Sequence, residues 1–211
     1  MFAGGAGLAA IAGMVNAATL AAGSLPVTHL TGSLSRVSGD IASGDFVHAI
    51  PLASITLGFV LGAAISGALV GEVSLRGGRA YGLALIAEAC LIALAALLLK
   101  PAPLIAVTAA AIGSGMQNAL AATYGRLIIR TTHMTGIATD IGVLLGRIAR
   151  GRPAERWKLA LLSALLAAFT LGGFAGWLLE ARLGADALLV PAGILLALGL
   201  AYRLVKRRLR E

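Results

Sequence analysis

Charged residues are scarce in this chain. Asp, Glu, Lys and Arg make up 12% of its 211 residues, whereas a soluble domain usually contains roughly 25%. Hydrophobic residues make up 59% of the chain, and the mean hydropathy is +0.93. This composition predicts an integral membrane protein with no room for a soluble domain of ordinary size.

Several chemical signatures are also missing. The single cysteine, Cys90, excludes an internal disulfide, and its apolar neighbours favour a packing role. No Gly-x-x-x-x-Gly-Lys motif is present, which argues against direct ATP-driven pumping. No nucleophile–base pair or zinc-ligand spacing is visible, so we expect no catalytic residue, metal or cofactor. The N-terminus lacks a basic region before its apolar run, which is typical of a first span rather than a signal peptide.

Long apolar runs dominate what is present. Six runs have the length of about 20 residues that a membrane-spanning helix needs. They are roughly residues 3–23, 49–71, 80–99, 103–123, 158–179 and 186–205. The chain is therefore expected to be an all-α polytopic membrane protein.

Two weaker segments lie between these runs and share a motif. Thr-His-x-Thr-Gly occurs in "VTHLTG" (27–32) and again in "TTHMTG" (131–136). Each copy follows a related stretch, "GMVNA" (13–17) or "GMQNA" (115–119). The order of span, motif segment, span and span occurs twice, which predicts an internal duplication into residues 1–100 and 101–211.

The basic residues indicate how the chain crosses the membrane. If neither motif segment crosses, fourteen of the seventeen Lys and Arg residues lie on the cytoplasmic side, and if both cross, twelve do. The positive-inside rule favours six spans with both termini cytoplasmic. Each half then has three spans, so the second half is inverted. The motif segments, 24–45 and 131–147, become re-entrant segments that enter from opposite faces.

We expect the motif residues to line a polar site at the repeat interface. In each segment the chain should enter extended and leave as a helix, roughly 33–43 and 137–148, with Thr31, Ser33 and Thr135 as N-cap types. Two helix N-termini near the membrane centre would favour an anion or a polar neutral solute. The predicted substrate-binding residues are Thr28, His29, Thr31, Gly32, Ser33, Thr132, His133, Thr135, Gly136, Asn16 and Asn118.

Three charged residues are predicted to tune or gate this site. Arg36 and Asp140 occupy equivalent positions after the two motifs, and an ion pair between them would relieve the cost of a charge at membrane depth. Glu88 lies in the middle of a span, where a protonatable carboxyl suits ion or proton coupling.

Each of these assignments has a purely structural alternative. The Thr and Ser hydroxyls can serve only to cap helices, and the histidines can hydrogen-bond across the repeat interface. The two asparagines and Glu88 can bond neighbouring helices. Gly58, Gly62, Gly172 and Gly176 have the spacing of packing faces.

With "RTTHMTGIATDIG", "THLTGSLSR" and "GMQNA", the sequence resembles the YoaK-like family of bacterial inner-membrane proteins, which is defined by a domain of unknown function. The resemblance covers nearly the whole chain. It implies a multi-pass protein of the bacterial cytoplasmic membrane and supplies little mechanism.

The sequence is therefore interpreted as a small-solute transporter or channel, not an enzyme, with an anion or small polar metabolite favoured. One alternative is a membrane-embedded metal or enzyme site that uses the two histidines with Asp140 or Glu88. Another is an assembly or sensor subunit that transports nothing. Expected partners are the solute and anionic lipids at the basic segments, with no nucleic acid. A bundle of this size is also compatible with a homodimer.

Overall fold

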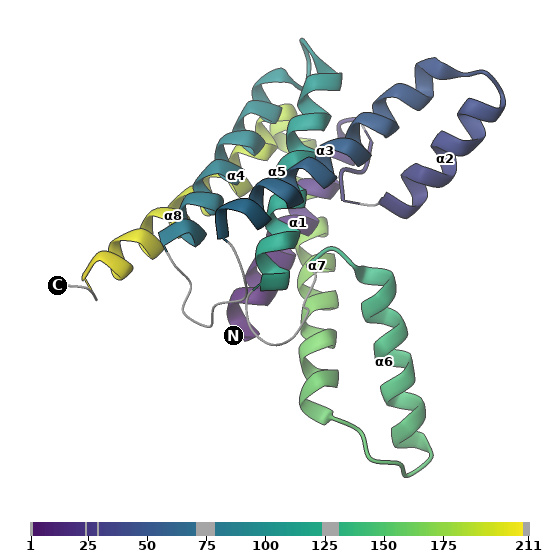
Figure 1. The fold of residues 1–211 in the computed structure, drawn as a ribbon, viewed down its shortest axis with the longest axis vertical. Coiled ribbons are helices and arrows are strands. Elements are labelled where there is room, and N and C mark those ends of the chain that lie inside the picture. Colours follow the sequence, from purple (N-terminus) through teal and green to yellow (C-terminus); the bar gives the residue numbers. More distant parts are fainter. Residues whose placement is uncertain (1, 24, 29, 71–78, 124–130, 209–211) are drawn as a thin grey trace.

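The computed structural model describes residues 2–23, 25–28, 30–70, 79–123 and 131–208, and every regular element in these ranges is a helix (Figure 1). The elements are α1 (Phe2–Ala21), α2 (Leu30–Ala42), α3 (Phe46–Val70), α4 (Arg79–Leu98), α5 (Pro103–Thr123), α6 (Met134–Ala149), α7 (Arg156–Leu183), the 3-10 helix η1 (Gly184–Leu188) and α8 (Leu189–Arg208). The helices lie close to the predicted apolar runs, with boundaries shifted by a few residues.

Most of these helices are long and apolar enough to cross a membrane. Five described stretches meet this condition: Gly4–Ala21, Phe46–Val70, Ala80–Leu98, Pro103–Ala121 and Arg156–Val205. The fifth stretch contains α7 and most of α8, and the chain turns between them at Gly184, where φ is +59°. Many large apolar side chains are exposed along these helices, as lipid contact requires. The protein is a polytopic helical membrane protein.

The two motif helices are shorter than the spans. The 13 residues of α2 and the 16 residues of α6 give lengths of about 20 and 24 Å, less than the roughly 30 Å of a bilayer core. Helix α2 packs against α3, and α6 packs against α7. These two hairpins project from the bundle in different directions (Figure 1).

The centre of the bundle is built from helices that are far apart in the sequence. Helix α1 packs most extensively against α7, α3 against α5, and α4 against α8. The main core joins buried side chains of α1, α4, α5 and α8, such as Val15, Ile92, Leu120 and Leu195. A smaller core joins α1, α6 and α7 around Leu161 and Leu165.

Glycines set how closely α1 approaches α7. A Cβ atom built on Gly13 would collide with the carbonyl oxygen of Phe169, and one built on Gly172 would collide with the carbonyl oxygen of Ala10. Only glycine allows the two backbones this separation. In lipid, such close packing replaces the hydrophobic effect as the force that holds helices together.

The contact between α3 and α5 has the same construction. A Cβ atom on Gly115 would collide with the carbonyl oxygen of Phe59, and one on Gly62 with that of Ile112. Gly115 and Gly13 occupy the same place in the "GMQNA" and "GMVNA" stretches. The glycines that the sequence predicts as packing faces therefore do lie at backbone contacts, in both halves of the chain.

We expect Gly13→Ala to destabilise the protein by about 1–3 kcal/mol or more, because the new methyl group would force α1 away from α7. The matched control is Gly7→Ala on the same helix, where nothing lies within 4 Å of the added Cβ. That control should be neutral or stabilising by up to about 1 kcal/mol. Thermal unfolding of both variants in detergent measures the difference. Equal stability of the two would contradict the close crossing.

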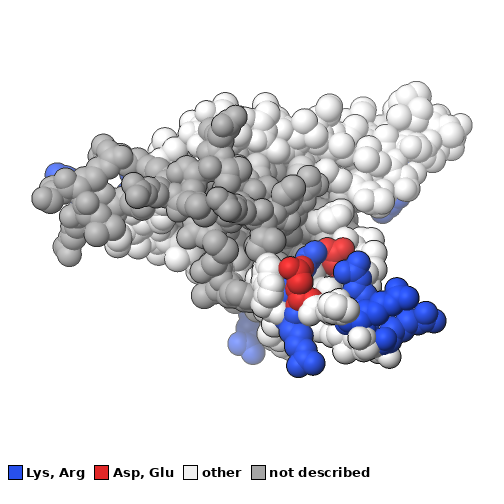
Figure 2. All heavy atoms as spheres, turned by 60° about the horizontal axis from the view of Figure 1, so that its bottom comes forward, with Lys and Arg blue, Asp and Glu red and all other residues white. Residues whose placement is uncertain are grey.

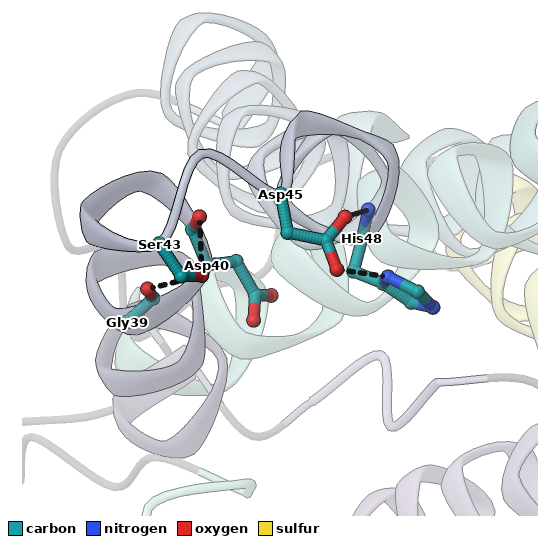
Figure 3. Close-up of polar contacts among 5 residues, drawn as sticks. All are labelled: Gly39, Asp40, Ser43, Asp45 and His48. Atoms are coloured by element: carbon teal, nitrogen blue, oxygen red, sulfur yellow. Dashed lines mark hydrogen bonds and ion pairs between the residues drawn. The ribbon is translucent and has the colours of Figure 1, made fainter.

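The turn between α2 and α3 is fixed by polar contacts (Figure 3). Gly44 has φ of +76°, and the Ser43 hydroxyl donates to the carbonyl oxygens of Gly39 and Asp40, at 3.0 Å in each case. Asp45 accepts the backbone N–H of His48 at 3.2 Å, and its other oxygen lies 2.7 Å from His48 Nδ1. Asp45 thus satisfies an otherwise free N–H at the start of α3, and the His48 side chain is exposed.

The Asp45 contacts predict a pH dependence. The side-chain hydrogen bond from His48, followed by its backbone N–H, lowers the pKa of the Asp45 carboxyl. A lowered folded-state pKa means that the carboxylate stabilises the fold above the unfolded-state pKa of about 4 and loses this effect as pH falls through the folded value. Asp45→Asn should therefore be less stable than the wild type near pH 7, and the gap should narrow as the pH falls below about 4 and through the lowered pKa of Asp45. Melting temperatures of both proteins across this range test the prediction, and a constant gap would contradict it.

Candidate functional site

The second motif forms the start of α6. His133 precedes the helix with φ of −88° and ψ of 57°, and no side chain among the described residues caps this end. The His133 ring folds back over Gly136, where an added Cβ atom would collide with ring atoms Cδ2 and Nε2. The motif glycine therefore makes room for the motif histidine. His29, the equivalent residue of the first motif, lies outside the described residues.

The helix starts differ from those predicted. Thr31, Ser33 and Thr135 were expected to cap their helices, but α2 already begins at Leu30 and α6 at Met134. These residues lie inside the first turn. Each helix begins directly after its histidine, so the hydroxyls are not in the N-cap position. N-cap propensity predicts which residue types favour a helix start but fixes that start only to within a few residues.

One cavity joins the two motif segments. It has a volume of about 340 Å³ and lies between residues that are about a hundred positions apart in the sequence. The first segment contributes Thr28, Leu30 and Thr31. The other lining residues are Phe59 of α3, Asn118 of α5, and Thr132, His133, Met134, Thr135, Gly136 and Thr139 around the start of α6. Neither a carboxylate nor a Lys or Arg side chain is among the described residues that line it.

The remaining residues of the first motif line a second cavity. This cavity of about 290 Å³ is bounded by Asn16, Leu20, Pro26, Gly32, Ser33, Arg36 and Leu52. Thr31 and Gly32 are neighbours on a helix and point about 100° apart, so α2 presents them to different sides. In the structure Asn16, Gly32 and Ser33 border this second cavity and are not among the described residues around the 340 Å³ cavity.

The two equivalent asparagines have different surroundings. Asn16 Oδ1 accepts the backbone N–H of Thr28 at 3.2 Å and the Thr28 hydroxyl at 2.8 Å, and Thr28 is buried. Asn118 Oδ1 is buried without a hydrogen-bond partner in the described part of the chain, and Asn118 lines the 340 Å³ cavity. Asn16 therefore holds the first motif segment against α1, while Asn118 leaves an acceptor open at the cavity.

We expect the same substitution to lower the stability of the protein at Asn16 and to leave it nearly unchanged at Asn118. Asn16→Leu removes the acceptor for two buried donors of Thr28 and should cost about 1–3 kcal/mol of stability. Asn118→Leu removes no hydrogen bond to the described residues and should be roughly neutral. Chemical or thermal unfolding of the purified variants tests this. A larger loss for Asn118→Leu would mean that its amide, not that of Asn16, holds the fold.

The expected ion pair between Arg36 and Asp140 does not form within the chain. Asp140 lies 3.9 Å from Lys158 Nζ of α7, and its side chain is 54% exposed. Arg36 is exposed on α2 beside the second cavity. The pair fails because α2 and α6 lie in separate hairpins and pack on different partners. Equivalent positions of the two motif segments therefore need not touch each other.

Glu88 is fully buried in α4, away from both cavities. Its side chain is 1% exposed, its Cγ packs close to Gly113 of α5, and Oε2 has no partner among the described residues. One turn further along α5, Gln117 Nε2 donates to the carbonyl oxygen of Leu8 at 2.5 Å and joins α5 to α1. A gating role would place Glu88 at the cavity. The structure instead places it in the helical core.

Some lining residues were not predicted. Thr139 lies one turn after Thr135 and donates its hydroxyl to the Thr135 carbonyl oxygen at 3.0 Å. The spacing of four residues on one helix face could have indicated it. Phe59 comes from a helix whose sequence has no polar feature at that point, and only the packing of α3 on α5 brings it to the cavity.

Fold and site together define a polytopic helical membrane protein with a cavity that residues from both copies of one polar motif line. A family described as "Protein of unknown function (DUF1275)" matches residues 4–201. The chain belongs to this family. No curated protein and no solved structure matches the chain.

Proposed function

We propose that the protein is a small-solute transporter or channel that binds its solute in the 340 Å³ cavity. The observation that supports this most is that both copies of the Thr-His-x-Thr-Gly region contribute to that one cavity. Its volume lies in the range of small-molecule sites, roughly 300–1,000 Å³. Lining polar groups at membrane depth are tolerated where they face such a space.

The same proposal includes two inverted repeats with six spans. The matched glycine contacts of α1 with α7 and of α5 with α3 support a duplicated scaffold. A stretch of 50 residues, Arg156–Val205, would be about 75 Å long as one helix, more than twice the bilayer core. Two crossings by α7 and α8 account for this length. The short α2 and α6 then act as the helical parts of re-entrant segments. The YoaK-like resemblance supports a bacterial cytoplasmic membrane, with both termini cytoplasmic.

The lining favours an anion or a small polar solute. The hydroxyl groups of Thr31, Thr132 and Thr135 and the amide of Asn118 offer hydrogen bonds without a fixed negative charge. The uncapped N-terminus of α6 adds backbone N–H groups and a partial positive charge. A cation would find no carboxylate among the described lining residues.

Transport through this cavity is tested by Thr135→Val. Purified protein in liposomes is assayed for flux of chloride, nitrate and phosphate and of small neutral polyols. We expect at least one probe to cross faster than in empty liposomes, and Thr135→Val to lower that flux several-fold because one cavity hydroxyl is lost.

Thr170→Val is the matched control. Thr170 is exposed on α7, and its hydroxyl bonds only within its own helix, to the Leu166 carbonyl oxygen at 2.9 Å. It should leave the flux unchanged. Equal losses in both variants, or no flux of any probe, would contradict the proposal and favour a non-transporting subunit.

A further inference from the structure

The tip of the α6–α7 hairpin gathers basic side chains. Figure 2 shows them at the end of the molecule where α6 and α7 join. The group, named here the basic tip, consists of Arg147, Arg150, Arg152, Arg156 and Lys158. Glu155 is the one acidic residue between positions 147 and 158. Asp140 of α6 lies beside Lys158. Five cations within twelve residues outnumber the nearby carboxylates.

The backbone holds this tip in a defined shape. Gly151 has φ of +63°, a left-handed backbone conformation that glycine adopts more readily than other residues. The N–H of Arg152 donates to the carbonyl oxygen of Arg147 at 2.9 Å, and the N–H of Arg150 donates to the same oxygen at 3.2 Å. The four arginines are exposed, so their guanidinium groups are available to a partner outside the chain.

Apolar side chains lie next to these cations. On α6, Val143, Leu145 and Ile148 are exposed, and Trp157 at the start of α7 is 46% exposed. Tryptophan and arginine side by side at the end of a span are typical of the membrane–water interface. A surface for nucleic acid or an acidic protein would not need this apolar flank.

The other hairpin has the opposite character. The tip of α2–α3 contains Asp40, Asp45 and His48, and no Lys or Arg occurs from residue 37 to residue 70. The basic tip is thus not a general property of these hairpins.

We infer that the basic tip is a binding surface for anionic phospholipid headgroups. Arginine presents a fork of N–H donors that matches a phosphate group. Val143, Leu145, Ile148 and Trp157 would sit against the acyl chains while the arginines reach the headgroups. This surface lies apart from the cavity residues and does not depend on which solute the protein carries.

The test compares two double variants with the same change in charge. Arg150→Gln with Arg152→Gln neutralises the basic tip, and Lys100→Gln with Arg182→Gln neutralises two exposed cations elsewhere. The full-length protein in neutral detergent is titrated with phosphatidylglycerol or phosphatidylcholine, and binding is followed by native mass spectrometry and by thermal stabilisation. We expect preference for phosphatidylglycerol, about tenfold weaker in the tip variant and nearly unchanged in the control. The preference should also fall in about 0.5 M salt.

Three outcomes would overturn the inference. The first is equal binding of both lipids by the wild type. The second is an equal loss in the two double variants, which would indicate a general charge effect. The third is tight binding of an oligonucleotide or polyglutamate by the wild type, lost in the tip variant, without any preference among lipids. Unchanged circular dichroism of the variants shows that a loss of binding is not a loss of folding.

Discussion

The close approach of backbones at glycine is the constraint on which the rest of this structure depends. In lipid there is no hydrophobic driving force for two apolar helices to associate, because acyl chains are as apolar as the side chains of a neighbouring helix. At Gly13 and Gly172 the backbones of α1 and α7 come so close that an added Cβ atom would collide with a carbonyl oxygen of the facing helix. Gly115 and Gly62 allow the same close approach between α5 and α3. Dispersion contacts then become dense enough to hold helices that are far apart in the sequence.

These crossings also position the polar residues. Asn16 and Asn118 each lie three residues after a crossing glycine, so each asparagine lies near one fixed point of the bundle. There Asn16 accepts a hydrogen bond from the Thr28 hydroxyl, and Asn118 lines the cavity. The motif segments then follow the helices: the α2 and α6 hairpins project from the crossings, and the starts of both helices return to one space. The cavity thus lies between helices that small residues bring together.

The sequence is informative where a single local property decides the outcome. Length and hydropathy predict the long helices. The repeated motif predicts that its two copies approach each other, and Thr28 and Thr31 of the first copy line one cavity with Thr132 and His133 of the second. It is less informative where the outcome depends on rotation about a helix axis. Gly32 and Ser33 turn to the second cavity because α2 places adjacent residues about 100° apart. Arg36 and Asp140 stay apart because the partners of α2 and α6 differ. No composition or spacing encodes those orientations, which follow from tertiary packing.

The unequal tips bear on how the proposed duplicated scaffold would insert into the membrane in one direction. Two inverted halves of identical charge would fit the membrane equally well either way up, because exchange of the halves would restore the same arrangement. Only four of the seventeen Lys and Arg residues occur before residue 101, and the α2–α3 tip has none while the α6–α7 tip has five. Basic residues near the ends of spans set orientation. On the proposed inverted arrangement, the basic tip therefore breaks the equivalence of the two faces, and the same arginines that would bind anionic headgroups hold the cavity in a fixed direction relative to the cell.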